Sequence, residues 1–207
     1  MADVFDYKKE YKALYSPKDQ PVIIEVPEKT SVDIYNSLSG PADENNIKEL
    51  ENTLKTDLPD TFKESLLIHN GQNETGNIIT FVDYHKLLSA NEMTKNYKML
   101  CGLFGADETV DFIEPDNCKY IKRNYIYNHK WLKFTESNGD GLIMDFDPGV
   151  KGTIGQIFFR PNGDNPVDKT IAKSYGNWLK KLCEKIENKE YKINNGEIVF
   201  EDIIFIE

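Results

Sequence analysis

One stretch decides the fold class of this chain: Trp131-Leu132-Lys133-Phe134-Thr135-Glu136-Ser137-Asn138-Gly139-Asp140-Gly141-Leu142-Ile143-Met144-Asp145-Phe146-Asp147-Pro148-Gly149. Its apolar segments at 131–134 and 142–146 are separated by the turn-forming cluster 137–141, and Asp147-Pro148-Gly149 supplies a second turn. A third apolar, β-branched segment follows at 154–159. Short turns join consecutive strands only in antiparallel pairs, so the pattern predicts an antiparallel meander of three strands.

Helical patterns precede this meander. Beginning at Asp43, apolar residues recur on one helix face up to the break at Leu58-Pro59. A capping-box pattern over 61–64 predicts a second short helix, ended by Asn70-Gly71. It would bury three apolar residues, Phe62, Leu66 and Leu67. A further capping box over 89–92 predicts a helix that ends near Gly102 or Gly105, after a β-branched strand at 78–82.

A last helix follows the meander. Apolar residues from Ile171 to Ile186 form one continuous stripe, which predicts a helix over 168–187 with Asp168 as its N-cap. A hairpin is predicted over 191–200. Helices first, a sheet in the middle and a helix last define an α+β fold, with a central antiparallel sheet and helices packed against it.

The chain divides into three parts on this reading. Residues 1–40 form an N-terminal extension, with a short tyrosine-rich helix and a strand over 21–27 between two prolines. Residues 41–190 form the α+β domain, and the hairpin of residues 191–207 is appended to it.

Composition restricts the function. The chain has 207 residues, 39% of them apolar, and a net charge of −10. This charge disfavours a general nucleic-acid binder and electrostatic docking on anionic membranes, and it favours either a cationic protein partner or simply solubility. The acidic start lacks the features of a signal peptide, and three widely spaced cysteines suit free thiols in a reducing compartment. We therefore expect a cytoplasmic protein.

The sequence contains no strong match to a catalytic motif. None of the three histidines, His69, His85 and His129, is flanked by a serine, cysteine or carboxylate at a known motif spacing. The glycine-rich segment 149–155 is not a phosphate-binding loop, because it enters a strand and lacks the Lys-Ser/Thr pair. We expect no enzyme activity and no cofactor.

The segment from Glu136 to Asp147 resembles a calcium-binding loop, with oxygen donors at positions 1, 3 and 5 and glycine at position 6. Strands instead of helices flank it, and position 12 is the short Asp147. Turn chemistry explains the Asn-Gly-Asp-Gly cluster without an ion, so we expect no functional metal site.

The stretch 107–116 is the most unusual part of the chain. Five of its ten residues are acidic and none is basic, and apolar residues such as Phe112 and Ile113 lie among them. A protein-recognition loop uses both kinds of residue, although a loop whose Phe112 and Ile113 cap the core would show the same pattern. The candidate partner-binding residues are these acids with Phe112 and three carboxylates of the meander: Asp107, Glu108, Asp111, Phe112, Glu114, Asp116, Asp140, Asp145 and Asp147.

Two groups of motifs resemble the SUKH superfamily, which includes the Smi/Knr cell-wall-assembly regulators. The first is the segment 58–71, with its leucine-proline start and asparagine-glycine end. The second is the tryptophan strand at 131–134, the hairpin and Asp-Pro turn at 138–149, and the strand at 152–157. The resemblance covers residues 43–187 and leaves the extension and the terminal hairpin unexplained.

The resemblance implies an α+β fold without catalytic residues or a cofactor. In bacteria, similar proteins are commonly immunity proteins that bind and neutralise a toxin, often a nuclease domain. In fungi, similar proteins are regulatory scaffolds of cell-wall assembly. We therefore expect a toxin-neutralising binding protein with a cationic partner, and a regulatory scaffold is the alternative.

Overall fold

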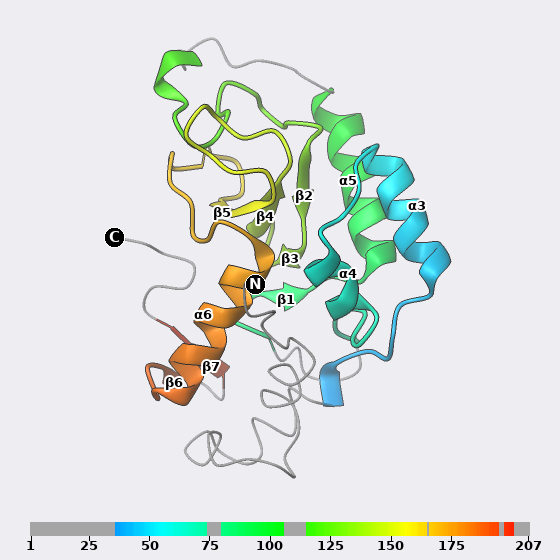
Figure 1. Cartoon of the computed structure of the whole chain (residues 1–207), viewed down its shortest axis with the longest axis vertical. Helices are drawn as coiled ribbons and strands as arrows, with labels where there is room; N and C mark the ends of the chain where they lie inside the picture. Colours follow the sequence, from blue (N-terminus) through cyan, green and yellow to red (C-terminus); the bar gives the residue numbers. More distant parts are fainter. Residues whose placement is uncertain (1–35, 74–79, 106–114, 165, 195–196, 201–207) are drawn as a thin grey trace, which may run out of the picture.

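The computed structural model describes residues 36–73, 80–105, 115–164, 166–194 and 197–200 (Figure 1). Within these residues, four α-helices pack with three small antiparallel sheets. The expected α+β class is confirmed.

The central sheet is the predicted meander. Strands β2 (Trp131–Lys133), β4 (Gly141–Asp145) and β5 (Gln156–Arg160) pair antiparallel in the order β2-β4-β5. The short strand β3 (Thr135–Glu136) leaves this sheet and pairs with β1 (Lys86–Leu87). Trp131, Asp145 and Gln156 share one row across the central sheet, because Asp145 pairs with both of the others.

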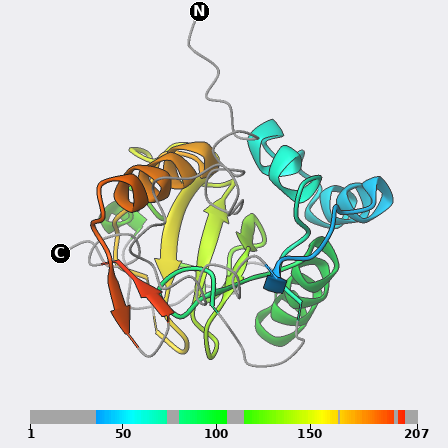
Figure 2. The ribbon, with the colours of Figure 1, turned by 90° about the horizontal axis from the view of Figure 1, so that it is seen from below.

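Side-chain alternation gives this sheet two different faces. One face contributes Leu132, Met144 and Ile157 to the main core, which also contains the buried residues of α6 (Tyr175–Glu187). The opposite face places Trp131, Ile143 and Phe158 in a smaller core with Leu100 of α5 (Ala90–Phe104). Figure 2 shows the sheet between α6 and the group of helices that contains α5.

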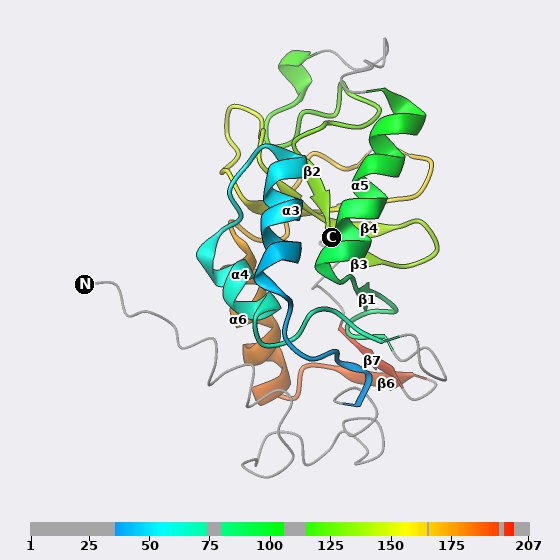
Figure 3. The ribbon, with the colours of Figure 1, turned by 90° about the vertical axis from the view of Figure 1, so that its right-hand side faces the viewer.

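Two helices begin where the sequence predicts. Helix α3 (Glu44–Leu54) starts after Asp43, whose carboxylate accepts a hydrogen bond from the Asn45 backbone N–H at 2.7 Å. Helix α5 starts after Ser89, and a reciprocal capping box joins Ser89 to Glu92. The two helices pack against each other, as Figure 3 shows.

The second predicted helix differs in its start and in its buried face. Helix α4 (Asp60–Leu66) begins two residues earlier than a capping box over 61–64 requires, with Pro59 at the N-cap and no side-chain capping bond, so that capping box is wrong. The Pro59 carbonyl oxygen accepts hydrogen bonds from the Phe62 and Lys63 backbone N–H groups, at 2.9 and 3.0 Å, which starts the helix at Asp60. Leu67 follows the end of the helix and is exposed, although burial was expected.

The last helix starts later than predicted. Helix α6 is capped by Ser174, and residues 168–174 are not helical. Their backbone pairs with the sheet instead, because Ile157 and Ala172 form an antiparallel bridge that holds this segment extended. Asp168 is therefore not an N-cap, and its carboxylate accepts hydrogen bonds from three consecutive backbone N–H groups, those of Lys119, Tyr120 and Ile121.

The remaining predictions have mixed outcomes. The terminal hairpin is present as β6 (Lys192–Asn194) and β7 (Glu197–Val199). Of the strand predicted over 78–82, only residues 80–82 are described. They form no strand, and Val82 makes a single bridge to His85 across the turn at 83–84. The elements predicted for residues 1–35 lie outside the described residues.

Candidate partner-binding surface

The hairpin turn between β3 and β4 uses its own carboxylates. Glu136 accepts a hydrogen bond from the Gly139 backbone N–H at 2.6 Å and forms an ion pair with Lys133 at 2.5 Å. Asp140 accepts from the Asn162 backbone N–H at 2.6 Å, which ties the turn to the segment after β5. Asp140 is half-buried, so one side of this predicted contact residue faces solvent.

Asp145 is fully buried and cannot contact a partner, which corrects its assignment as a candidate contact. Its two oxygens accept hydrogen bonds from the Asp147 backbone N–H at 3.0 Å and from Gln156 Nε2 at 2.9 Å. Burial raises the pKa of Asp145 to about 6, and these hydrogen bonds oppose the shift only in part. Gln156 also donates to the Tyr120 carbonyl at 2.7 Å, so the Asp-Pro turn and the glycine-glutamine strand form one internal network.

Asp147 lies at the edge of this network and is 35% exposed. It accepts hydrogen bonds from Lys122 at 2.5 Å and from Asn128 at 3.0 Å. Burial alone would raise the pKa of Asp147, but these two hydrogen bonds outweigh burial and lower it. Its negative charge is therefore already matched by a lysine.

The carboxylates of the calcium-like segment do not converge. Across the described parts of the chain, no group of three or more His, Cys, Asp or Glu side chains is arranged to hold a metal ion. Glu136 and Asp147, at the two ends of the segment, are each paired with a lysine.

Most of the acidic stretch lies outside the described residues. The candidate contacts that lie outside them are Asp107, Glu108, Asp111, Phe112 and Glu114. Asp116 is described; it is exposed and lies in the short 3-10 helix η2 (Pro115–Asn117). Just before the stretch, the end of α5 exposes two large apolar side chains, Met99 at 52% and Leu103 at 67%. Exposed apolar side chains followed in the sequence by acidic residues match the composition of interfaces that have an apolar centre and a charged rim.

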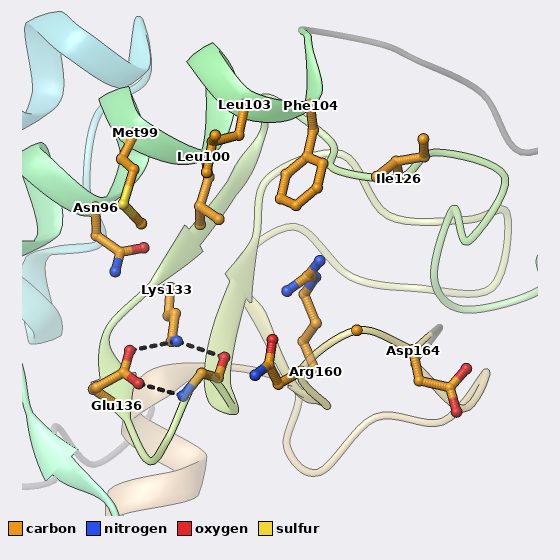
Figure 4. Close-up of a pocket in the computed structure, with 13 residues that line it drawn as sticks. Asn96, Met99, Leu100, Leu103, Phe104, Ile126, Lys133, Glu136, Arg160 and Asp164 are labelled. Carbon is orange, nitrogen blue, oxygen red and sulfur yellow. Dashed lines mark hydrogen bonds and ion pairs between the residues drawn. The ribbon is translucent and has the colours of Figure 1, made fainter.

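Sequence reasoning missed a pocket between α5 and the central sheet. The pocket has a volume of about 560 Å³, and its lining includes Met99, Leu103 and Phe104 on one side and Lys133 and Arg160 on the other (Figure 4). The Lys133 side chain packs against the backbone of Gly141. A Cβ atom added at Gly141 would lie only 2.3 Å from Lys133 Cε. Gly141 thus lets the lysine reach the Gly139 carbonyl oxygen at 2.7 Å and Glu136.

Arg160 is the more unusual cation of this pocket, because the residue is only 9% exposed. Its guanidinium lies over the Tyr127 ring at 5.9 Å, and its buried Nε has no hydrogen-bond partner. Burial lowers the pKa of Arg160. Strand alternation from Trp131 could have placed Lys133 and Arg160 on one face, but only the position of α5 makes that face a pocket.

The described contacts of the histidines are structural. His85 is buried, and its Nδ1 lies 2.9 Å from Thr135 Oγ1. Burial lowers the pKa of His85 to about 4, so the ring is neutral at pH 7. His69 Nδ1 lies 3.0 Å from the Ser39 carbonyl oxygen.

A comparison with protein families identifies the class of protein. Residues 41–181 match the SMI1/KNR4 family (SUKH-1). This match spans more than half of the chain, and the protein belongs to this family. The resemblance read from the sequence motifs is thereby confirmed. A search among curated proteins gave no match. Among the described helices, none is long and apolar enough to cross a lipid bilayer.

Proposed function

We propose that this protein is a non-enzymatic immunity protein that neutralises a cognate bacterial toxin domain by binding it directly. Membership of the SMI1/KNR4 family, which includes immunity proteins, is the observation that carries this proposal. The net charge of −10 supports a cationic partner, such as a nuclease domain whose own ligand is a polyanion.

The proposed contact surface combines the acidic stretch 107–116 with the exposed end of α5. Opposite charge accelerates encounter, whereas buried apolar anchors slow dissociation. Met99 and Leu103 are large and exposed, and they precede the acidic residues directly in the sequence. Phe112 is a further candidate anchor. Asp140 and Asp147 form a secondary part of the proposed surface because both are partly exposed, while Asp145 is excluded by its burial.

The first experiment asks whether the protein neutralises a toxin at all. The partner to test is the toxin domain encoded beside the gene of this protein, expressed in cells with and without it. An immunity protein restores growth and copurifies with the toxin domain at a fixed ratio. Unchanged toxicity together with no complex would refute the proposal. A regulatory scaffold would leave the toxin active.

The second experiment locates the surface by binding kinetics. A variant with Asp107→Asn, Glu108→Gln, Asp111→Asn and Glu114→Gln should associate about tenfold more slowly at low salt, and the difference should shrink as salt is raised. The matched control removes four exposed carboxylates that lie outside the stretch 107–116, through Glu44→Gln, Asp57→Asn, Asp60→Asn and Glu187→Gln. Equal association rates in the two variants would show that total charge matters and that the stretch 107–116 has no special role.

A further inference from the structure

The pocket beneath α5 contains a buried cation without an anionic partner. Arg160 is the last residue of β5, and its guanidinium points into the pocket beneath Phe104 (Figure 4). Within the described residues, no hydrogen bond or ion pair to this guanidinium is present, and its one aromatic contact is the Tyr127 ring. A buried guanidinium without a counter-charge is costly, because it loses hydration and gains nothing equivalent in return.

The other charged residues near the pocket do not compensate Arg160. Glu136 is held by Lys133 and by the Gly139 backbone N–H, at 2.5 and 2.6 Å. The Asp164 carboxylate points away from Arg160 (Figure 4). Arg160 also lies close enough to lower the pKa of Lys133, although burial is the main cause of that shift. Among the described residues, Lys133 thus has Glu136 as its counter-charge, whereas Arg160 has none.

The walls of the pocket define the rest of the ligand. Met99, Leu103 and Phe104 supply an apolar wall, and Asn96 contributes a buried side-chain oxygen that accepts no hydrogen bond. The pocket volume of about 560 Å³ lies in the range of small-ligand sites, which combine apolar walls with a few polar groups. The complementary ligand therefore has an apolar body, one planar anionic group for the guanidinium, and an N–H donor for Asn96.

We propose that this pocket binds the carboxyl end of a polypeptide that finishes in an apolar residue. The terminal carboxylate pairs with Arg160, the last side chain packs against Met99, Leu103 and Phe104, and the last amide N–H donates to Asn96. A phosphate is disfavoured because Lys133 is already neutralised by Glu136, so only one cation awaits a partner. This inference does not depend on the proposed toxin partner, and either can fail alone.

The test is calorimetric titration of the full chain at pH 7 with two matched pairs of probes. The first pair is a hexapeptide ending in leucine with a free carboxylate, and the same peptide as its carboxamide. The second pair is N-acetyl-leucine and N-acetyl-leucinamide. Each free acid should bind at least about tenfold more tightly than its amide, because a charge-assisted hydrogen bond to Arg160 is lost in the amide.

Variants assign the effect to Arg160. Arg160→Gln should weaken binding of the free acids by about tenfold or more. Arg123→Gln removes the same charge from the chain's other arginine, which does not line the pocket, and should bind like the parent. Should Arg160→Gln fold poorly, Leu103→Glu at the exposed rim keeps the test decisive. The lost apolar contact weakens acids and amides alike, whereas the added charge repels only the acids, so the preference for acid over amide should fall.

Different results of these titrations support or overturn the proposal. A hexapeptide acid that binds more tightly than N-acetyl-leucine supports a polypeptide end as the natural ligand, and equal affinities support recognition of the terminal residue alone. Acids and amides that bind alike would overturn the proposal. It would also be overturned by inorganic phosphate binding as tightly as the acids, by unchanged binding in both Arg160→Gln and Leu103→Glu, or by no acid binding below about 10 mM.

Discussion

Replacing His85 by asparagine tests the electrostatics of the buried hairpin. His85 is 3% exposed and contacts Thr135 Oγ1 through Nδ1 at 2.9 Å. Thr135 Oγ1 already accepts the Leu142 backbone N–H, so its hydroxyl proton is free to be donated to Nδ1 of a neutral ring. Burial is the main cause of the lowered pKa, with a further lowering by Lys133, while Asp140 and Glu136 act in the opposite direction.

The magnitude follows from the two pKa values of His85, 6.5 in the unfolded chain and about 4 in the folded protein. Since the folded pKa is depressed, the unfolded chain binds the extra proton between these values, and stability falls as pH falls. From pH 7 to pH 5 the unfolded histidine titrates over about 1.5 pH units, which removes about 2 kcal/mol from the free energy of unfolding.

His85→Asn removes this titration but keeps a polar acceptor for Thr135. We expect the variant to be less stable than the parent at pH 7, and the difference to shrink by about 2 kcal/mol at pH 5. Urea unfolding at both pH values, monitored by tryptophan fluorescence, measures the free energy of unfolding of the variant and the parent. Leu87→Val in the neighbouring strand carries no titratable group, and its stability cost should be the same at both pH values. A pH-independent difference for His85→Asn would refute the reasoning.

Three further predictions concern packing and metal binding. Trp178→Ala should lower the free energy of unfolding by about 3–5 kcal/mol, because Trp178 is fully buried against the rings of Phe134 and Tyr175. A variant as stable as the parent in chemical denaturation would contradict its core role. Gly141→Ala should cost about 1–3 kcal/mol in the same assay, since the new Cβ would lie 2.3 Å from Lys133 Cε and 2.8 Å from the Thr135 carbonyl oxygen. Gly102→Ala, in an open part of helix α5, should instead stabilise by about 0.5–1 kcal/mol, and equal effects at the two glycines would argue against the crowding explanation. Calcium titrated at low salt should show no affinity tighter than the millimolar range, and a micromolar site abolished by Asp140→Ala would disprove this.

Local chemistry explains why so much of the fold could be predicted. The meander follows from apolar segments separated by Asn-Gly-Asp-Gly and Asp-Pro-Gly turns, and helix α5 follows from the Ser89–Glu92 capping box. Each of these signals is complete within about a dozen residues. The errors occur where a distant segment competes with the local signal. The residues before α6 have the apolar spacing of a helix, yet Ala172 pairs with Ile157, so the helix begins only after Ser174.

For the candidate site, too, some properties follow from the sequence and others only from the tertiary structure. The sequence by itself determined the strand order, the family resemblance and the acidic character, because these depend on residue type and spacing. Only the tertiary structure decided that Asp145 is an internal hydrogen-bond acceptor, that Asp168 holds three backbone N–H groups, and that Arg160 lies in a pocket beneath α5. The physical reason is that burial and charge pairing depend on which distant segments meet around a side chain. A carboxylate or a guanidinium has the same sequence signature in water as in a core, and its environment exists only after α5, the sheet and the long loops have packed together.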